Sequence, residues 1–311
     1  MSQRYVAGFI TASYNGFKVP DAPTIGTASS ASTTSVSVTF TAPSNVGGAA
    51  ITSYIATARK ISDGTTISTS GSSSPIVITG LTLETSYTVT VTATNTYGTG
   101  PSSAASNSVT PFYAIGASYG GGYYAGDIST SGNGVADYRL VVGPKSGAET
   151  FGAMGPSNTN YSTYSLINGP SNSSTLAANG VTAASFCEGL TIGGYSDWYM
   201  PSLYEFEVVY YNLKPTTNSN NTGFGTNAYS VPARASNYTA GTPPQTSVAA
   251  FQSTGGEYLN TSGNPYYWTS TQVTDSGSLG NAYRFGADQG NIPNANITNN
   301  GYTRAVRRVA I

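Results

Sequence analysis

Three acidic residues near aromatic side chains are the part of this sequence best suited to do chemistry. Asp197, Glu205 and Glu207 lie in the stretch GGYSDWYMPSLYEFEVVYYNLKP, which runs from Gly193 to Pro215. A glycoside hydrolase uses two carboxylates about 5 to 10 Å apart across a cleft. The 311-residue chain has no histidine and a single cysteine, so Ser-His-Asp and Cys-His catalysis and histidine zinc sites are excluded. A glycan-cleaving enzyme that uses Asp197 and Glu205 remains as the catalytic hypothesis.

The same stretch also predicts structural roles for these residues. Ser202 and Glu205 have the spacing of a capping box, in which the serine hydroxyl accepts from the Glu205 N–H and the carboxylate reaches back. Asp197 lies in a tight turn, where a carboxylate is expected to accept from turn or tryptophan N–H groups. Pro201 is expected to end the turn, directly before the helix that begins at Ser202. We therefore expect no catalytic residue and predict a structural motif made of Asp197, Trp198, Pro201, Ser202, Glu205, Trp268 and Arg307.

Neutral loops rich in tyrosine and asparagine are the other place to look for function. Tyrosine gives large contacts at low entropic cost, and Asn, Gln and Ser side chains can pair with sugar hydroxyls. The segments 218–221, 266–272 and 288–300 have this composition. No calcium-loop pattern of clustered oxygen ligands occurs, so neither a metal nor a cofactor is expected. The candidate ligand-binding residues are Tyr266, Tyr267, Gln272, Asp288, Asn291, Asn294 and Asn296.

The chain carries little charge. Charged residues make up 8% of the sequence and the net charge is -1, which provides neither a basic surface for nucleic acid nor a polybasic membrane patch. The first residues lack the features of a secretory signal, and no run of about 20 apolar residues occurs. We expect folding in a cytoplasm, no nucleic-acid partner and no membrane insertion. The length of 311 residues favours two domains.

Hydrophobic periodicity changes along the chain. Residues 21–111 alternate apolar and polar side chains in short runs separated by Gly or Pro turns, which predicts a β-sandwich. Two later segments have helical periodicity, one around Ser174–Leu190 and one from Ser202 to just before Pro215. Loops and short strands are expected after Pro215. The predicted sandwich core is Val36, Val38, Phe40, Tyr54, Ile78, Leu81, Tyr87, Val89 and Val91, and the predicted stripe of the second helix is Leu203, Phe206, Tyr210 and Leu213.

The motifs of residues 21–111 resemble a fibronectin type III domain. They are DAPTIGTA, APSNVGGAAITSY and GLTLETSYTVTVTATNTYGTGPSSAASNSVTP. The resemblance implies an all-β, immunoglobulin-like sandwich in which the spacing of Leu81 and Tyr87 makes a tyrosine corner. The family's usual early tryptophan is absent, and Phe40 is its expected substitute. An RGD signal is also absent, so the resemblance favours a spacer.

The later region is similar to the DUF1566 family, also called the Lcl C-terminal domain. The segments that carry the similarity are AASFCEGLTIGGYSDWYMPSLYEFEVVYYNL, YYWTSTQ and AYRFGADQGNIPNANITNNGYTRAVRRV, and it covers about residues 116–311. It implies a compact α+β C-type lectin-like domain with two helices and short strands, among relatives that are mostly adhesive. The formylglycine-generating activity known on this fold depends on a cysteine pair, which one cysteine does not supply.

Three segments and three hypotheses follow. Residues 1–20 are predicted to dock onto other virion proteins, residues 21–111 to form the fibronectin domain and residues 112–311 the lectin-like domain. The leading hypothesis is a non-enzymatic surface protein of a phage virion, a tail fibre or other adhesin that binds a host-surface glycan or protein, with homo-oligomerisation as an option. An extracellular or cell-surface location is the alternative to the virion. The competing functions are a capsid or tail decoration protein or filament subunit, and the glycan-cleaving enzyme.

Overall fold

The computed structural model describes residues 17–156, 159–274 and 280–311. The chain divides into two compact units, Met1–Ala114 (unit 1) and Ile115–Ile311 (unit 2). The docking role predicted for residues 1–20 falls mostly outside the described residues. The last four of them lie on unit 1, where the Phe17 ring stacks on Tyr97 with 5.1 Å between ring centroids.

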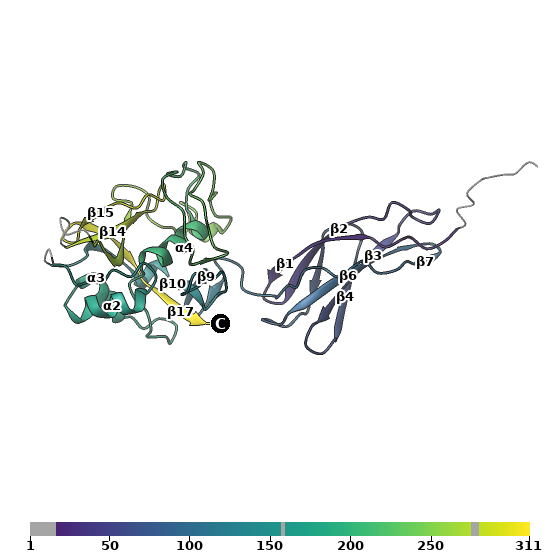
Figure 1. The fold of residues 1–311 in the computed structure, drawn as a ribbon, viewed down its shortest axis with the longest axis horizontal. Helices are drawn as coiled ribbons and strands as arrows, with labels where there is room; N and C mark the ends of the chain where they lie inside the picture. The colour runs from purple at the N-terminus through teal and green to yellow at the C-terminus, as the bar shows by residue number, and fades with distance from the viewer. Residues whose placement is uncertain (1–16, 157–158, 275–279) are drawn as a thin grey trace, which may run out of the picture. The chain divides into compact units, whose positions relative to one another are not determined.

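Unit 1 consists of two antiparallel sheets (Figure 1). The first has the order β1-β2-β5 and the second the order β4-β3-β6-β7. Alternation of side chains along each strand puts one face inward, as in β6, where every second residue is buried. The strands are β1 (Thr24–Ser32), β2 (Ser35–Thr41), β3 (Ser53–Lys60), β4 (Thr66–Gly71), β5 (Ile76–Thr79), β6 (Tyr87–Asn95) and β7 (Gly98–Thr99).

The predicted core of unit 1 is confirmed. All nine residues expected from the alternation are buried in one hydrophobic cluster. The tyrosine corner is also present, because the Tyr87 hydroxyl accepts a hydrogen bond from the Thr82 N–H at 3.1 Å. Phe40 packs against Tyr54, with 4.7 Å between ring centroids, in the core that lacks the usual tryptophan.

Unit 2 contains two five-stranded sheets and is a mixed α+β fold. One sheet has the order β12-β9-β10-β17 with β8 paired to β9, and the other the order β11-β16-β13-β14-β15. Strands β10 and β17 lie side by side although about half the chain separates them (Figure 1). The strands are β8 (Ser118–Tyr119), β9 (Gly122–Ile128), β10 (Tyr138–Val142), β11 (Glu149–Ala153), β12 (Ser230–Val231), β13 (Tyr266–Gln272), β14 (Asn281–Gly286), β15 (Asn294–Asn296), β16 (Asn300–Arg304) and β17 (Val306–Ala310).

The single helix predicted around Ser174–Leu190 is wrong. Two helices occupy this segment, α2 (Gly169–Ala178) and α3 (Thr182–Glu188). Gly180 lies between them with a φ of 74°, a conformation that glycine adopts without a steric penalty and that ends the helix. Apolar residues of both helices still meet in one cluster, because the two short helices pack on each other. The unit also has a single irregular turn, α1 (Lys145–Ala148), and a 3-10 turn, η1 (Ala249–Phe251).

The second predicted helix is confirmed as α4 (Leu203–Leu213), and its four stripe residues are buried. The helix lies between the two sheets. Val208, Val209 and Leu213 pack with β9 and β10, while Phe206 and Tyr210 pack with side chains of β13 and β14. Since both sides of α4 are covered, the helix has no wide polar face and brings its glutamates into the interior.

Candidate functional site

Glu205 is fully buried and its carboxylate is already occupied. It accepts from the Ser202 N–H at 2.8 Å and from the Ser202 hydroxyl at 2.7 Å, so the carboxylate side of the capping box is present. It also accepts from the Tyr199 hydroxyl and from Arg308 Nε at 2.6 Å. Burial raises the pKa of Tyr199 well above its usual value, and the negative charge of Glu205 is the second cause of this increase. Glu205 therefore fixes the start of α4 against β17.

Glu207 is also buried, with 1% of its surface exposed, and is enclosed by polar partners. Arg234 and the Tyr238 hydroxyl donate to its carboxylate, and the Asn227 amide donates at 2.7 Å. Burial lowers the pKa of Arg234 to about 10. A carboxylate with this many donors is held in one position, so Glu207 ties the 227–238 loop to α4.

Asp197 has a different partner from the one that the sequence predicts. It forms a bidentate pair with Arg307, at 2.7 Å to Nε and 2.8 Å to Nη2, whereas the Trp198 indole N–H donates to the Tyr195 carbonyl at 3.0 Å. The hydrogen bond from Arg307 lowers the pKa of Asp197. The guanidinium of Arg307 also lies 3.9 Å from the centre of the Tyr195 ring. The turn is therefore fastened to β17.

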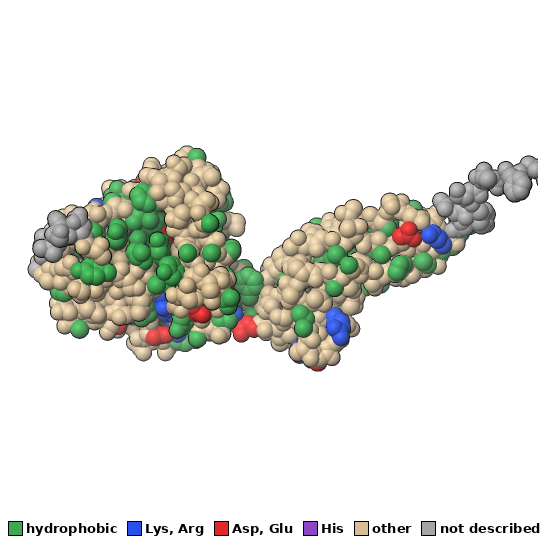
Figure 2. All heavy atoms as spheres, viewed as in Figure 1, with side chains coloured by type: hydrophobic (Ala, Val, Ile, Leu, Met, Phe, Trp, Pro, Cys, Tyr) green, Lys and Arg blue, Asp and Glu red, His purple; other side chains and the backbone are tan. Residues whose placement is uncertain are grey.

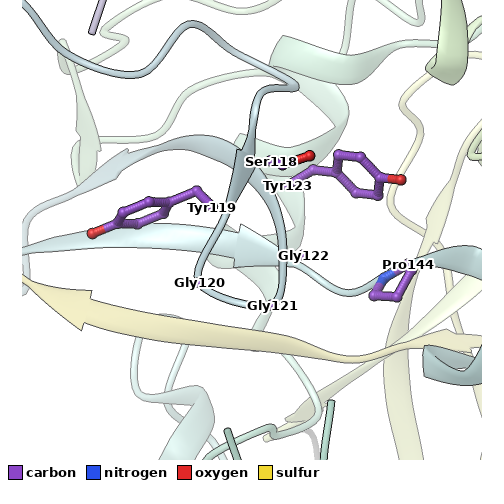
Figure 3. A pocket seen from close by; sticks show the side chains of 7 residues that line it. All are labelled: Ser118, Tyr119, Gly120, Gly121, Gly122, Tyr123 and Pro144. Atoms are coloured by element: carbon purple, nitrogen blue, oxygen red, sulfur yellow. The ribbon is translucent and has the colours of Figure 1, made fainter. Parts of the chain in front are cut away.

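A glycine hairpin completes this fastening and was not recognised from the sequence. Arg307 Nη1 donates to the Gly120 carbonyl at 3.0 Å, and a Cβ on Gly193 would come within 2.6 Å of the Gly121 Cα. The hairpin also borders a recess of about 380 Å³ from which Tyr119 and Tyr123 project to opposite sides (Figure 3). The YGGGYY run is the signal that could have indicated this close packing. No charged side chain lines the recess, which makes it a weak candidate for an active site.

A second set of buried charges was also missed. Arg304 has no exposed surface and pairs with Glu149 at 3.2 Å and with Glu257 at 2.7 Å. Lys145 donates to the Tyr258 carbonyl at 3.0 Å, and burial lowers the pKa of this lysine. The two positive charges of this set equal its two negative charges in number. The contacts join the 257–260 loop to β11 and β16. No local spacing could have predicted the contacts, because the Arg304 partners are 47 and 155 residues away.

Two of the predicted ligand-binding residues lie in the core. Tyr267 is fully buried and its hydroxyl donates to Glu149 at 2.8 Å. Gln272 is 1% exposed, and its amide donates to the Thr159 carbonyl at 2.9 Å. The neighbouring Trp268 is fully buried in the cluster with α2 and α3. Tyr267 and Gln272 are therefore not accessible to a ligand at the surface, in contrast to their prediction.

The other predicted residues lie on β13 and β15 or in the 287–293 segment between β14 and β15. Tyr266 is opposite Gly286 in the ladder, and Asn294 is exposed opposite Tyr283. A Cβ on Gly286 would lie 2.0 Å from Asn291 Oδ1 and 3.4 Å from Asp288 Oδ1. The structure thus brings together Tyr266, Asp288 and Asn291 beside Gly286. Asn296 lies at the far end of β15, where its side chain accepts from the Thr298 N–H and hydroxyl.

Arg284 lies among these residues and was not predicted. Its guanidinium carbon is 4.5 Å from the centre of the Tyr266 ring and 5.3 Å from that of Trp268. Arg284 and Trp268 are also direct partners in the β13–β14 ladder. Burial lowers the pKa of Arg284. We call Tyr266, Trp268 and Arg284 the arginine–aromatic cluster.

Loops after Pro215 converge on the C-terminal end of α4. The Tyr210 hydroxyl donates to Asn220 Oδ1 at 2.9 Å, and the Asn221 N–H donates to the Gln289 carbonyl at 2.8 Å. Two of the three predicted segments, 218–221 and 288–300, are therefore in contact. A recess of about 220 Å³ lies nearby, lined by Tyr211, Ala233, Arg234, Ala235, Ser236, Asn237, Tyr238 and Thr242.

The face of unit 2 that is seen in Figure 2 shows mostly uncharged polar and hydrophobic groups with few charges. Within the described parts of the chain, no group of three or more His, Cys, Asp or Glu residues is arranged to hold a metal ion. The described helices include none with the length and apolar character of a membrane span. The arrangement can offer aromatic rings, amides and hydroxyls to a ligand, together with the guanidinium of Arg284.

Comparisons with known proteins identify unit 1. A family model described as the fibronectin type III domain matches residues 21–109, which therefore form such a domain. Similar solved structures include a titin fragment, with 28% identity over 30% of this chain and 32% of that chain and a TM-score of 0.29. Another is the FN5 domain of Drosophila Lar, with 25% identity over 31% of this chain and 100% of that domain and a TM-score of 0.26. The chain thus spans about a third of the titin fragment. No curated protein matches the chain.

Proposed function

We propose that the protein is a non-enzymatic adhesin of a phage virion, a tail fibre or other surface protein, in which the fibronectin domain spaces a C-type lectin-like unit that binds a host-surface glycan or protein. The observation that carries the proposal is that three acidic residues of unit 2 have structural partners, while its neutral loops are free to contact a ligand. Asp197, Glu205 and Glu207 are held in ion pairs, whereas neutral tyrosine- and asparagine-rich loops converge at the surface. Such loops suit recognition better than acid–base chemistry.

The lectin-like assignment of residues 116–311 is supported by contacts between its sequence motifs. Asp197 belongs to the Gly-Gly-Tyr-Ser-Asp-Trp turn and Arg307 to the closing Val-Arg strand. The two side chains form a bidentate pair across 110 residues of sequence. Motifs that are characteristic of one family are expected to contact each other in the folded domain. The catalytic alternative loses support because Glu205, its second carboxylate, is fully buried.

Host-cell binding tests the proposal. The purified full-length protein is incubated with candidate host cells and with their extracted surface polysaccharide, and the retained protein is measured. We expect binding to at least one of them and no release of new reducing ends. A folded protein that binds neither would overturn the adhesin role, and its presence in a virion lattice would then favour the decoration protein. Release of reducing ends would instead support the enzyme.

A matched pair of variants locates the binding surface. Ser236 and Asn237 are exposed and line the recess beside α4, so S236A/N237A should weaken cell binding about tenfold if two hydrogen bonds to the ligand are lost. Ser72 and Ser73 are exposed on unit 1, and S72A/S73A should leave binding unchanged. Equal binding by both variants would place the ligand elsewhere on unit 2.

A further inference from the structure

Arg284 is half-buried and differs in its partners from other arginines of unit 2. Four of them are ion-paired, but no residue in the described part of the chain offers Arg284 a carboxylate at salt-bridge distance. Partial burial of a charge without a partner is unfavourable, and contact with aromatic faces offsets only part of the cost. The ion pairs of the others are Arg234–Glu207, Arg304 with Glu149 and Glu257, Arg307–Asp197 and Arg308–Glu205.

The donors of Arg284 are also unused. Its Nε is buried and has no hydrogen-bond partner. No described residue accepts from Nη1 or Nη2, and neither atom is among the buried unpartnered ones, so both are in reach of solvent. The rings of Tyr266 and Trp268 fix the position of the guanidinium. A fixed, planar group with free donors matches a carboxylate or phosphate.

Unsatisfied polar atoms are concentrated in the sequence that forms β13 and β14 and in the residues just before β13. Among the described residues, five buried side-chain nitrogen or oxygen atoms have no partner, and four belong to residues 264–284. Buried polar groups are nearly always hydrogen-bonded, so such a concentration calls for an explanation by a bound group or water. Tyr266 and Trp268 are two apart in β13, which places them on one side of the strand, whereas the ladder is irregular between Trp268 and Gln272. The four atoms are Asn264 Oδ1, Trp268 Nε1, Ser270 Oγ and Arg284 Nε.

Acceptor groups lie beside Gly286, the next residue of β14 on the same side as Arg284. Gly286 is two residues beyond Arg284 on β14, and the side-chain oxygens of Asp288 and Asn291 approach the position that its Cβ would take. These oxygens can accept hydrogen bonds from hydroxyl groups. The β13–β14 pair and the 288–291 segment thus offer donors for an oxyanion and acceptors for hydroxyls, as a charged sugar requires.

We propose that the arginine–aromatic cluster is an anion subsite that binds the carboxylate or phosphate of an acidic glycan, with Arg284 as the residue that contacts the oxyanion. The assignment of this glycan to a host surface rests on the proposed function, whereas binding of the oxyanion does not. A neutral glycan would leave the guanidinium uncompensated. The alternative is that Arg284 only stabilises the sheet through its contacts with the two rings.

Calorimetric titration of the full-length protein tests the subsite. The probes are glucuronate for the carboxylate, glucose 6-phosphate for the phosphate and glucose as the neutral reference. One charge-assisted pair is worth about 1.5 to 3 kcal/mol, so we expect the matching anionic sugar to bind roughly 10- to 100-fold more tightly than glucose. Trp268 is one of two tryptophans, so binding should also change the tryptophan fluorescence.

Variants separate recognition from stability. R284Q should abolish the preference for the anionic sugar, and R284K, which keeps the charge but not the planar fork, should reduce it and serves if R284Q fails to fold. Arg59 is exposed on unit 1, so R59Q is the matched control and should bind like the original protein. Equal affinity for all three probes, or an unchanged preference in both Arg284 variants, would overturn the subsite. Cell binding that persists under either result would leave the adhesin proposal intact.

Discussion

The acidic residues of the 193–215 stretch differ from a catalytic pair in how fully their oxygens are occupied. A glycosidase acid must exchange a proton with its substrate, which requires an accessible oxygen. Glu205 and Glu207 are buried, and each accepts from an arginine and a tyrosine. Asp197 is the exposed member, yet both of its oxygens bind Arg307. At the scale of single residues, the three carboxylates join segments that are distant in sequence.

Asp197→Asn should lower stability without unfolding the protein. Arg307 has only 8% of its side chain exposed and loses its counter-ion, but the Asp197 side chain is 55% exposed, so solvent screens the pair. We expect a loss of about 1 kcal/mol, which is a fall of roughly 2 to 4 °C in the melting temperature of unit 2. Circular dichroism melting at neutral pH measures it. Asp21→Asn is the control, because Asp21 is equally exposed but pairs with a half-exposed lysine.

The same pair predicts a pH dependence. The folded-state pKa of Asp197 is lowered by Arg307, so its contribution to stability is fully present above the unfolded pKa of about 3.9 and is lost as the pH falls through the folded value. The difference in melting temperature between the original protein and Asp197→Asn should therefore be constant near neutral pH and shrink below about pH 4. A difference that grows on acidification would contradict this role of the pair.

Local patterns predicted the elements, but contacts between distant segments decided which of their faces are buried. The capping box at Ser202 was predicted because its partners are three residues apart. The ion pair between Glu205 and Arg308 spans 103 residues, and no spacing rule indicates it. Tyr267 was expected to face a ligand, but both faces of β13 are covered, so alternation along the strand could not identify an exposed side.

Gly180→Ala tests the break between α2 and α3. Gly180 has a φ of 74°, and a Cβ there would meet no atom within 4 Å, so the cost is conformational rather than steric. We expect a loss of about 1 kcal/mol in the free energy of unfolding, measured by urea denaturation. Gly241→Ala, at an exposed glycine without a positive φ and with equal space, should change stability by less than about 0.5 kcal/mol. Equal losses would show that the backbone conformation at Gly180 is unimportant.

The two units differ in how much of their structure the sequence determines through local signals. In unit 1, neighbouring strands are mostly close in sequence, and alternation, turns and the tyrosine corner predict the sandwich. In unit 2, β10 pairs with β17 and β11 with β16, so the sheets depend on segments from both ends of the unit. Each hydrophobic cluster nevertheless takes all its members from one unit. The molecule therefore has separate cores.

Separate cores predict two independent unfolding transitions in differential scanning calorimetry. Val36 is fully buried in unit 1, and Val36→Ala should cost roughly 2 kcal/mol. In a domain of about 100 residues this lowers the melting temperature by roughly 8 to 16 °C. Only one transition should move in Val36→Ala, and only the other in Gly180→Ala, because neither substitution touches the other core. A single transition that shifts with both variants would show that the units fold as one cooperative structure, and the fibronectin domain would then be more than a spacer.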